Sequence, residues 1–270
     1  MAKDTQYSAK IIFTACPGRV QPGARIAMQN VITIHGYGFD RRIWSPVELA
    51  FEGYNSIHLE LPGFGDAAPL EDYSLAWLAD QYWLALDRMG VSDGHLLGHS
   101  MGGYVAVAMA ALRPHALRSL SLVHSHVFAD TEEKKKARQS SADDIRSSGR
   151  HVIIDKLIPS VFGHADLHAE TIRLLMNRAS RVGEAAWIAG LIAMRNRADH
   201  QETLARLDCP IHIVCGLLDN AVVPETAFAQ AALSARTKLT VYPHVGHMSM
   251  YETGPELIRD ISGFLSFSEG

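Results

Sequence analysis

The sequence is poor in the features that mark disulfide-rich, metal-binding and nucleic-acid-binding proteins. Its 270 residues include only three cysteines, Cys16, Cys209 and Cys215, an odd number without C-x-x-C spacing, which argues against a disulfide framework and a zinc site. It also has no excess of positive charge, because 25 Lys and Arg residues face 29 Asp and Glu residues, for a net charge of -4. Such a balance offers no electrostatic footprint for nucleic acid or anionic lipid. We therefore expect neither a nucleic-acid nor a membrane partner.

Long hydrophobic runs are missing as well. No apolar stretch reaches the roughly 18 residues that would suggest a membrane span, and the opening MAKDTQYSAK lacks the apolar core of a secretory signal. We expect a cytoplasmic protein with reduced thiols. The length permits one elaborated α/β domain or two smaller domains. The sequence allows a homo-oligomer but gives no sign of one.

The sequence does contain short apolar runs that alternate with stretches of helical spacing. Runs typical of buried strands lie at residues 9–14, 31–35, 56–61, 95–97, 119–124, 211–215 and 238–242. Helical spacing predicts helices at residues 75–89, 102–112, 225–233 and 255–267. This alternation favours a doubly wound, mostly parallel sheet, because helical crossovers join parallel strands and cover both faces.

One interval breaks the alternation. Residues 127–209 show helical patterns and no convincing strand, and a structureless connection of that length is rare in a compact domain. We therefore expect an inserted helical cap at 127–209 and a core made of residues 1–126 and 210–270. The lysines at 134–136 are interpreted as a solvated helix face, with Glu132 four residues before the last of them.

The segment from Gly98 to Gly103 has the spacing G-x-S-x-G between a predicted strand and a predicted helix. A sharp strand-to-helix turn holds the central Ser100 in a strained conformation with its hydroxyl exposed, and side chains at the glycines would clash with the strand and the helix. The helix N-terminus also brings backbone N–H groups to the place where an oxyanion would form. Ser100 is therefore the candidate nucleophile.

A nucleophilic serine needs a base, and the base needs an orienting acid. Asp219 and His247 each follow a predicted strand, and the carboxyl ends of parallel strands meet at one edge of the sheet. We expect both side chains to reach Ser100 there, with His247 as the base and Asp219 as the acid. Asp130 is the alternative acid and His244 the alternative base.

A further loop, His35-Gly36-Tyr37-Gly38, follows the strand at 31–35. The backbone N–H groups of Tyr37 and Met101 are the expected oxyanion-hole donors. His35 is interpreted as a structural residue of this loop. His99 is expected beside the elbow, and the pair His124 and His126 in the wall of the pocket.

These segments together resemble a known family. The motifs are H-G-Y-G at 35–38, L-P-G-F-G at 61–65, G-H-S-M-G-G at 98–103, G-L-L-D-N-A-V-V-P at 216–224 and V-G-H-M at 245–248. In content and order they are similar to those of the α/β-hydrolase fold superfamily, in the group of small serine esterase-like enzymes with a helical cap.

The resemblance implies an α/β fold with a mostly parallel sheet of eight strands and a helical cap inserted after the sixth strand. It also implies a triad of Ser100, Asp219 and His247 that needs neither cofactor nor metal. Similar proteins usually have Asp where this chain has Glu60, which leaves the hydrogen bonding of that loop open.

The expected activity is hydrolysis of an ester or related acyl bond of a small, partly apolar substrate through an acyl-enzyme. Fold does not fix chemistry, and C–C bond hydrolases, lactonases and perhydrolases use the same scaffold and triad. A slow-turnover ligand receptor that keeps the triad is a further alternative. The sequence does not identify the substrate.

Overall fold

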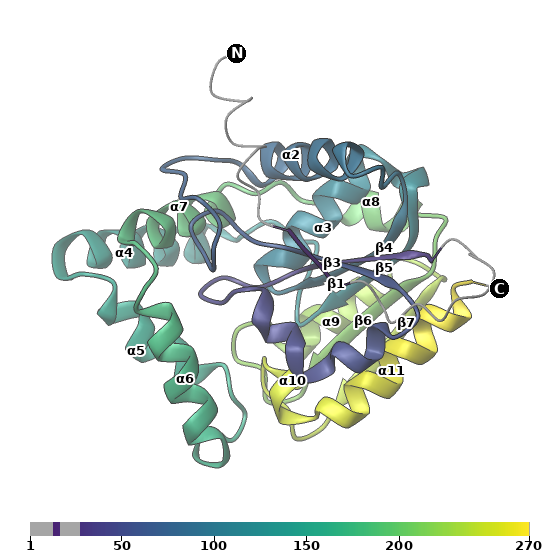
Figure 1. Ribbon diagram of the computed structural model, residues 1–270. Helices are drawn as coiled ribbons and strands as arrows, with labels where there is room; N and C mark the ends of the chain where they lie inside the picture. The colour runs from purple at the N-terminus through teal and green to yellow at the C-terminus, as the bar shows by residue number, and fades with distance from the viewer. Residues whose placement is uncertain (1–12, 17–27, 270) are drawn as a thin grey trace.

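The computed structural model describes residues 13–16 and 28–269, in which one twisted sheet is enclosed by helices (Figure 1). The sheet has the strand order β1-β3-β2-β4-β5-β6-β7. Only β1 runs antiparallel to its neighbour, and every other neighbouring pair is parallel. The doubly wound, mostly parallel sheet expected from the sequence is thus confirmed.

The strands lie close to the predicted runs. They are β1 (Phe13–Cys16), β2 (Asn30–Ile34), β3 (Asn55–Leu59), β4 (Gly94–His99), β5 (Leu117–Val123), β6 (Ile211–Gly216) and β7 (Thr237–Tyr242). Of the strand predicted at 9–14, residues 9–12 lie outside the described residues. The expectation of eight strands is wrong for the described chain, because only one antiparallel strand, β1, precedes β2 there and the sheet has seven.

Helices pack on both sides of the sheet. Figure 1 shows α2 (Leu75–Arg88) and α3 (Met101–Leu112) on one side and η1 (Arg41–Phe51) with α11 (Gly254–Phe267) on the other. The remaining core helices are η2 (Pro114–Ala116), α9 (Pro224–Ala231) and α10 (Ser249–Glu252). Ser74 caps α2 by accepting a hydrogen bond from Trp77 N, so the helix begins at residue 75 as predicted.

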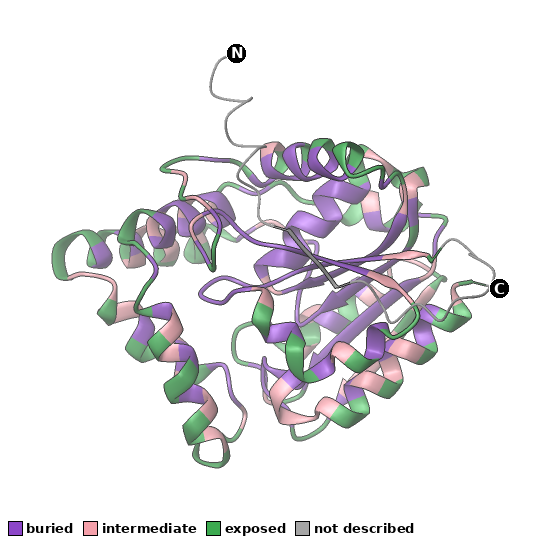
Figure 2. Cartoon of the chain, viewed as in Figure 1, coloured by how far each residue is buried: buried purple, intermediate pink, exposed green. Residues whose placement is uncertain are grey.

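The core lies where β4 and β5 meet α3. All residues of β4 are buried, and so are ten consecutive residues of α3 from its first turn onward. Figure 2 shows this buried layer continuing through the sheet. A helix that is apolar on all sides belongs in the interior, so α3 is held rigidly beneath the loops at the strand ends.

The interval between β5 and β6 contains helices joined by loops, and no strand, within the described residues. It contains α4 (Glu132–Ser148), α5 (His151–Ser160), η3 (Ala165–His168), α6 (Ala169–Ala179), α7 (Glu184–Arg195) and α8 (Gln201–Arg206). In Figure 1, α4 to α7 project beyond the sheet, whereas α8 returns to contact α3. In the described sheet this interval follows the fifth strand, β5, and not a sixth, because one strand fewer than expected precedes it.

Candidate active site

Ser100 stands at the turn between β4 and α3 in a conformation that few residues adopt. Its φ is 51° and its ψ is -120°, and its backbone N–H donates to the carbonyl of Val123 at 3.1 Å. A Cβ on Gly98 would overlap Gly103, and a Cβ on Gly102 would overlap the carbonyl of Ile34. The strained elbow and its need for glycine, both predicted from the sequence, are therefore present.

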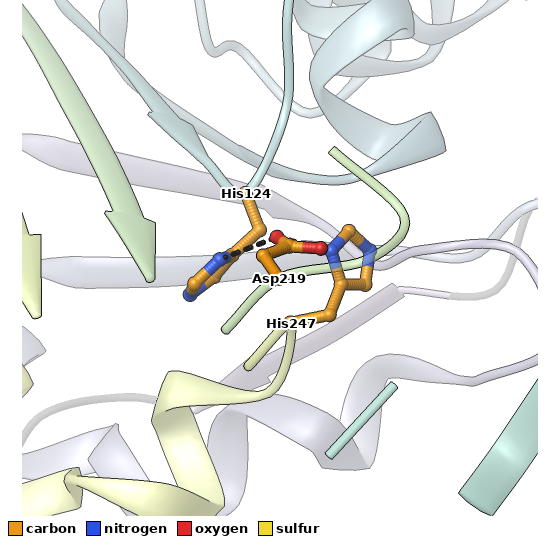
Figure 3. A group of neighbouring side chains, drawn as sticks. All are labelled: His124, Asp219 and His247. Atoms are coloured by element: carbon orange, nitrogen blue, oxygen red, sulfur yellow. Dashed lines mark hydrogen bonds and ion pairs between the residues drawn. The ribbon is translucent and has the colours of Figure 1, made fainter. Parts of the chain in front are cut away.

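Asp219 and His247 meet at the carboxyl ends of β6 and β7 (Figure 3). His247 Nδ1 lies 2.8 Å from Asp219 Oδ2, and both residues are buried. The other carboxylate oxygen, Oδ1, accepts from the backbone N–H groups of Ala221 and Val222, each at 2.9 Å. The backbone of the turn after β6 thus holds the Asp219 carboxylate in place. The carboxylate orients the imidazole ring of His247 through Nδ1, which leaves Nε2 for other partners.

His124 is a second histidine on the same carboxylate, a contact that its position in the sequence does not predict. Its Nδ1 lies 3.0 Å from Asp219 Oδ2 (Figure 3), and its φ of 50° is uncommon for a residue other than glycine. Burial lowers the pKa of His124 against the opposing effect of Asp219, so it stays neutral. Burial alone would raise the pKa of Asp219, but hydrogen bonds and charge interactions with His247 and His124 hold that pKa well below its ordinary value.

The His124, Asp219 and His247 ligand atoms lie within 4.8 Å of one another, a spacing that a metal site also requires. Both Nδ1 atoms, however, face one oxygen of one carboxylate at hydrogen-bond distance. Such a pattern orients imidazole rings and stabilises a positive charge on His247. We therefore interpret the cluster as a hydrogen-bonded charge network.

His99 lies beside the elbow, as its position in the sequence predicts. Its Nε2 is 3.0 Å from the carbonyl of His247, and the two rings are 4.8 Å apart. A Cβ on Gly36 would lie 2.5 Å from His99 Nδ1 and 3.1 Å from Ser100 Cβ. His99 thus packs between the Gly36 loop and His247, while Gly36 lets that loop approach Ser100.

The Tyr37 loop is held from two directions. His35 Nδ1 lies 2.9 Å from the carbonyl of Gly36 and its Nε2 accepts from Leu61 N at 3.0 Å, which is the structural role expected of His35. The Tyr37 hydroxyl donates to the carbonyl of Trp187 in α7 at 2.8 Å. This buried bond joins the loop directly to the inserted helices.

A second connection to the insertion is made next to His247. The His247 N–H donates to the carbonyl of Val161 at 2.7 Å. The carboxylate of Glu252 accepts from Gly246 N and Met248 N, both at 3.0 Å, and from Gly163 N at 2.8 Å. One carboxylate therefore holds both neighbours of His247 and the turn after α5, which sequence spacing alone did not reveal.

The two alternatives to the triad residues lie in different surroundings. Asp130 is buried in ion pairs with Arg138 and with Arg197 Nη1, the latter at 2.7 Å, and it makes no hydrogen bond to His247 within the described chain. His244 is exposed, whereas His247 is 2% exposed. The structure thus brings Asp219 and His247 together and leaves both alternatives apart from them.

Glu60, the departure from the family motif, has a defined set of partners. Its carboxylate accepts from Asp66 N at 2.6 Å and from Arg41 N at 3.2 Å, and it pairs with the Arg41 guanidinium at 3.0 Å. Gly65, with a φ of 57°, leaves room for the longer side chain, because a Cβ there would overlap the carboxylate. The Glu thus closes its own loop.

Comparison with known proteins identifies the family of this chain. The model of the alpha/beta hydrolase family matches residues 31–261. The chain belongs to that family. Within the described residues, no helix is both long and apolar enough to cross a membrane.

Relatives in the alpha/beta hydrolase family differ in the reactions their names describe. The chain is 26% identical to a 2-succinyl-6-hydroxy-2,4-cyclohexadiene-1-carboxylate synthase from Klebsiella pneumoniae, over 95% of this chain and 100% of the relative. It is 24% identical to a pimeloyl-[acyl-carrier protein] methyl ester esterase from Pseudoalteromonas atlantica, over 86% and 92%. A thermophilic esterase from Thermogutta terrifontis shares the fold, with a TM-score of 0.85 at 24% identity and coverage of 96% and 100%. The comparisons therefore establish the family, and the reaction is inferred from the geometry of the site.

Proposed function

We propose that the protein is a serine hydrolase that cleaves an ester or related acyl bond of a small, partly apolar substrate through an acyl-enzyme. The observation that carries this proposal is the buried pair of His247 Nδ1 and Asp219 Oδ2, 2.8 Å apart, at the sheet edge where Ser100 occupies a strained elbow. A serine, a base and an orienting acid are the parts that acyl transfer needs.

In this mechanism Ser100 Oγ attacks the substrate carbonyl while His247 Nε2 takes the hydroxyl proton. His247 then gives that proton to the leaving alkoxide, and the acyl group remains on Ser100. Water next attacks the ester carbonyl with His247 again as base, which frees the acid product and restores the serine. Asp219 keeps the Nδ1 proton on the ring and stabilises the imidazolium that forms twice per cycle.

The oxyanion would be bound by the backbone N–H groups of Tyr37 and Met101. Met101 opens α3, where the first N–H groups of a helix have no intrahelical partner. The described chain shows no hydrogen bond from either N–H group, so both donors are available. A donor of this kind contributes about 3 kcal/mol to transition-state stabilisation.

Residues 127–209 would serve as a cap over this site, with 1–126 and 210–270 as the catalytic core. The support comes from two contacts: Trp187 binds the Tyr37 side chain, and Val161 binds the backbone of His247. The insertion thus touches the loops that carry two of the proposed roles.

The same site is chemically competent for other acyl or carbon–carbon cleavages, so the competing hypotheses are a C–C bond hydrolase, a lactonase, a perhydrolase and a slow-turnover receptor. A panel of p-nitrophenyl esters of graded chain length, lactones and vinylogous diketones separates them. We expect esters to be turned over continuously, and Ser100→Ala to lower kcat by several orders of magnitude without loss of folding. Ester hydrolysis that is unchanged in Ser100→Ala would refute the proposal, and rates confined to another substrate group would redirect it.

A further inference from the structure

A cavity of about 320 Å³ lies between the inserted helices and the proposed catalytic loops. Its lining includes Tyr37 from the oxyanion loop and Ala221 from the turn that binds Asp219. Leu157 and Leu191 supply apolar wall on the side of α5 and α7. The cavity therefore adjoins the loops that hold the proposed oxyanion hole and Asp219, although Ser100 and His247 are not part of its lining.

The charged residues of the cavity wall all have the same sign. Lys134 and Arg138 reach it from α4 and Lys156 from α5, and its lining within the described chain contains no Asp or Glu. The chain as a whole has more acidic than basic residues, so composition does not explain this bias. Neither Lys134 nor Lys156 forms an ion pair with another described residue.

Arg138 is a fixed part of this wall. Its guanidinium pairs with Asp130, whose side chain is fully buried, and only 21% of the Arg138 side chain is exposed. Asp130 also pairs with Arg197 at 2.7 Å, so one carboxylate serves two guanidinium groups. Among the described residues, Arg138 Nη1 has the sulfur of Met194 as its one hydrogen-bond partner, at 3.4 Å, and a thioether is a weak acceptor.

The lysines at 134–136 lie on a solvated face of α4, as interpreted from the sequence, because Lys134 and Lys136 are exposed and Lys135 is half-buried. Glu132 pairs with Lys135 at 2.8 Å, not with the lysine four residues on. Lys134, although exposed, also lines the cavity. Burial lowers its pKa, as is usual for an ammonium group partly removed from water.

We propose that this cavity is an anion subsite that makes the preferred substrate an ester carrying a carboxylate or a phosphate-like group away from the scissile bond. Lysine and arginine bind such oxyanions through charge-assisted hydrogen bonds. The apolar walls accommodate the chain between the anion and the carbonyl. The role of this subsite in turnover rests on the proposed function, whereas its binding of an anion does not.

The kinetic test compares two esters of similar size, neutral p-nitrophenyl valerate and anionic mono-p-nitrophenyl glutarate. We expect the wild-type kcat/KM for the glutarate ester to exceed that for the valerate ester. Replacement of Lys134 and Lys156 together by Gln should lower this ratio by about tenfold or more, since each charge-assisted bond is strong. Lys135→Gln is the matched control on the same helix and should keep the ratio. The lysines are chosen over Arg138 because the latter holds a buried ion pair.

Binding without turnover provides an independent test. Glutarate and inorganic phosphate, each compared with NaCl at equal ionic strength, should raise the Tm of wild type and of Lys135→Gln but not of the double variant, and the larger shift identifies the preferred anion. A ratio and a Tm shift that survive in the double variant would overturn the subsite while leaving the hydrolase intact. If neither ester is cleaved but the Tm shift follows the lysines, the hydrolase fails and the subsite stands.

Discussion

Glu252→Gln tests whether the carboxylate that holds the His247 loop matters for catalysis. Glu252 accepts three backbone N–H groups, two from the neighbours of His247 and one from Gly163. Glutamine keeps one acceptor oxygen and turns an NH2 group toward N–H donors, so one or two of those donors lose their partner. An unmet buried donor costs about 1–3 kcal/mol, and partial exposure of Glu252 places the expected loss of unfolding free energy at about 1–2 kcal/mol.

The effect on turnover follows from the position of His247. A misplaced base that forfeits about 1.4 kcal/mol of transition-state stabilisation lowers kcat about tenfold, whereas KM should change little because Glu252 does not line the cavity beside the site. Steady-state hydrolysis of a p-nitrophenyl ester and urea unfolding measure the two quantities. Glu256→Gln is the control, since this exposed side chain accepts from the Thr253 hydroxyl and holds no backbone N–H group next to His247. A kcat in Glu252→Gln equal to that of the control would refute the positioning role.

Four further predictions concern the acid, a buried histidine, the elbow and an open position in α11. Asp219→Asn should lower kcat by about 10⁴-fold in the ester assay by favouring the wrong imidazole tautomer; retention of most activity would contradict the assignment. Burial lowers the pKa of His212 to about 3, so below pH ~6.5 the unfolded chain takes up a proton that the folded chain does not. The free energy of unfolding therefore decreases as the pH is lowered, by at most about 2 kcal/mol at pH 5. Urea midpoints between pH 7 and 5 should decline less steeply in His212→Gln, and parallel curves would speak against this. Gly98→Ala should prevent stable folding because its Cβ meets Gly103, while Gly263→Ala, in an open position of α11, should raise stability by about 0.5–1 kcal/mol in the same urea assay.

Much of the fold and the proposed triad could be predicted because their signals are local. The five consecutive residues of the G-x-S-x-G motif specify the elbow, and Asp219 and His247 each follow a strand closely. A parallel sheet brings such strand ends together whatever the loops between them do. The strand count was the exception, because it was taken from the family resemblance and not from the runs in this chain.

The missed contacts depend on register and on packing across the insertion. His124 reaches Asp219 because Val123 pairs with Val214 in neighbouring strands, and spacing along the chain does not specify such a register. Glu252 reaches Gly163 across 89 residues. Lys134 lines the cavity and Lys135 pairs with Glu132, a difference that depends on the orientation of α4 and that the run of like charges does not reveal.

The central claim is that Ser100 carries the acyl group. A fluorophosphonate probe followed by intact mass and peptide mapping tests it most directly, with substrate turnover measured on the same preparation. We predict one adduct on the Ser100 peptide, loss of esterase activity in proportion to labelling, and no adduct in Ser100→Ala. Labelling without sustained turnover of the unmodified protein would favour a receptor, and full activity with Ser100 unlabelled, or an adduct on another residue, would contradict the account.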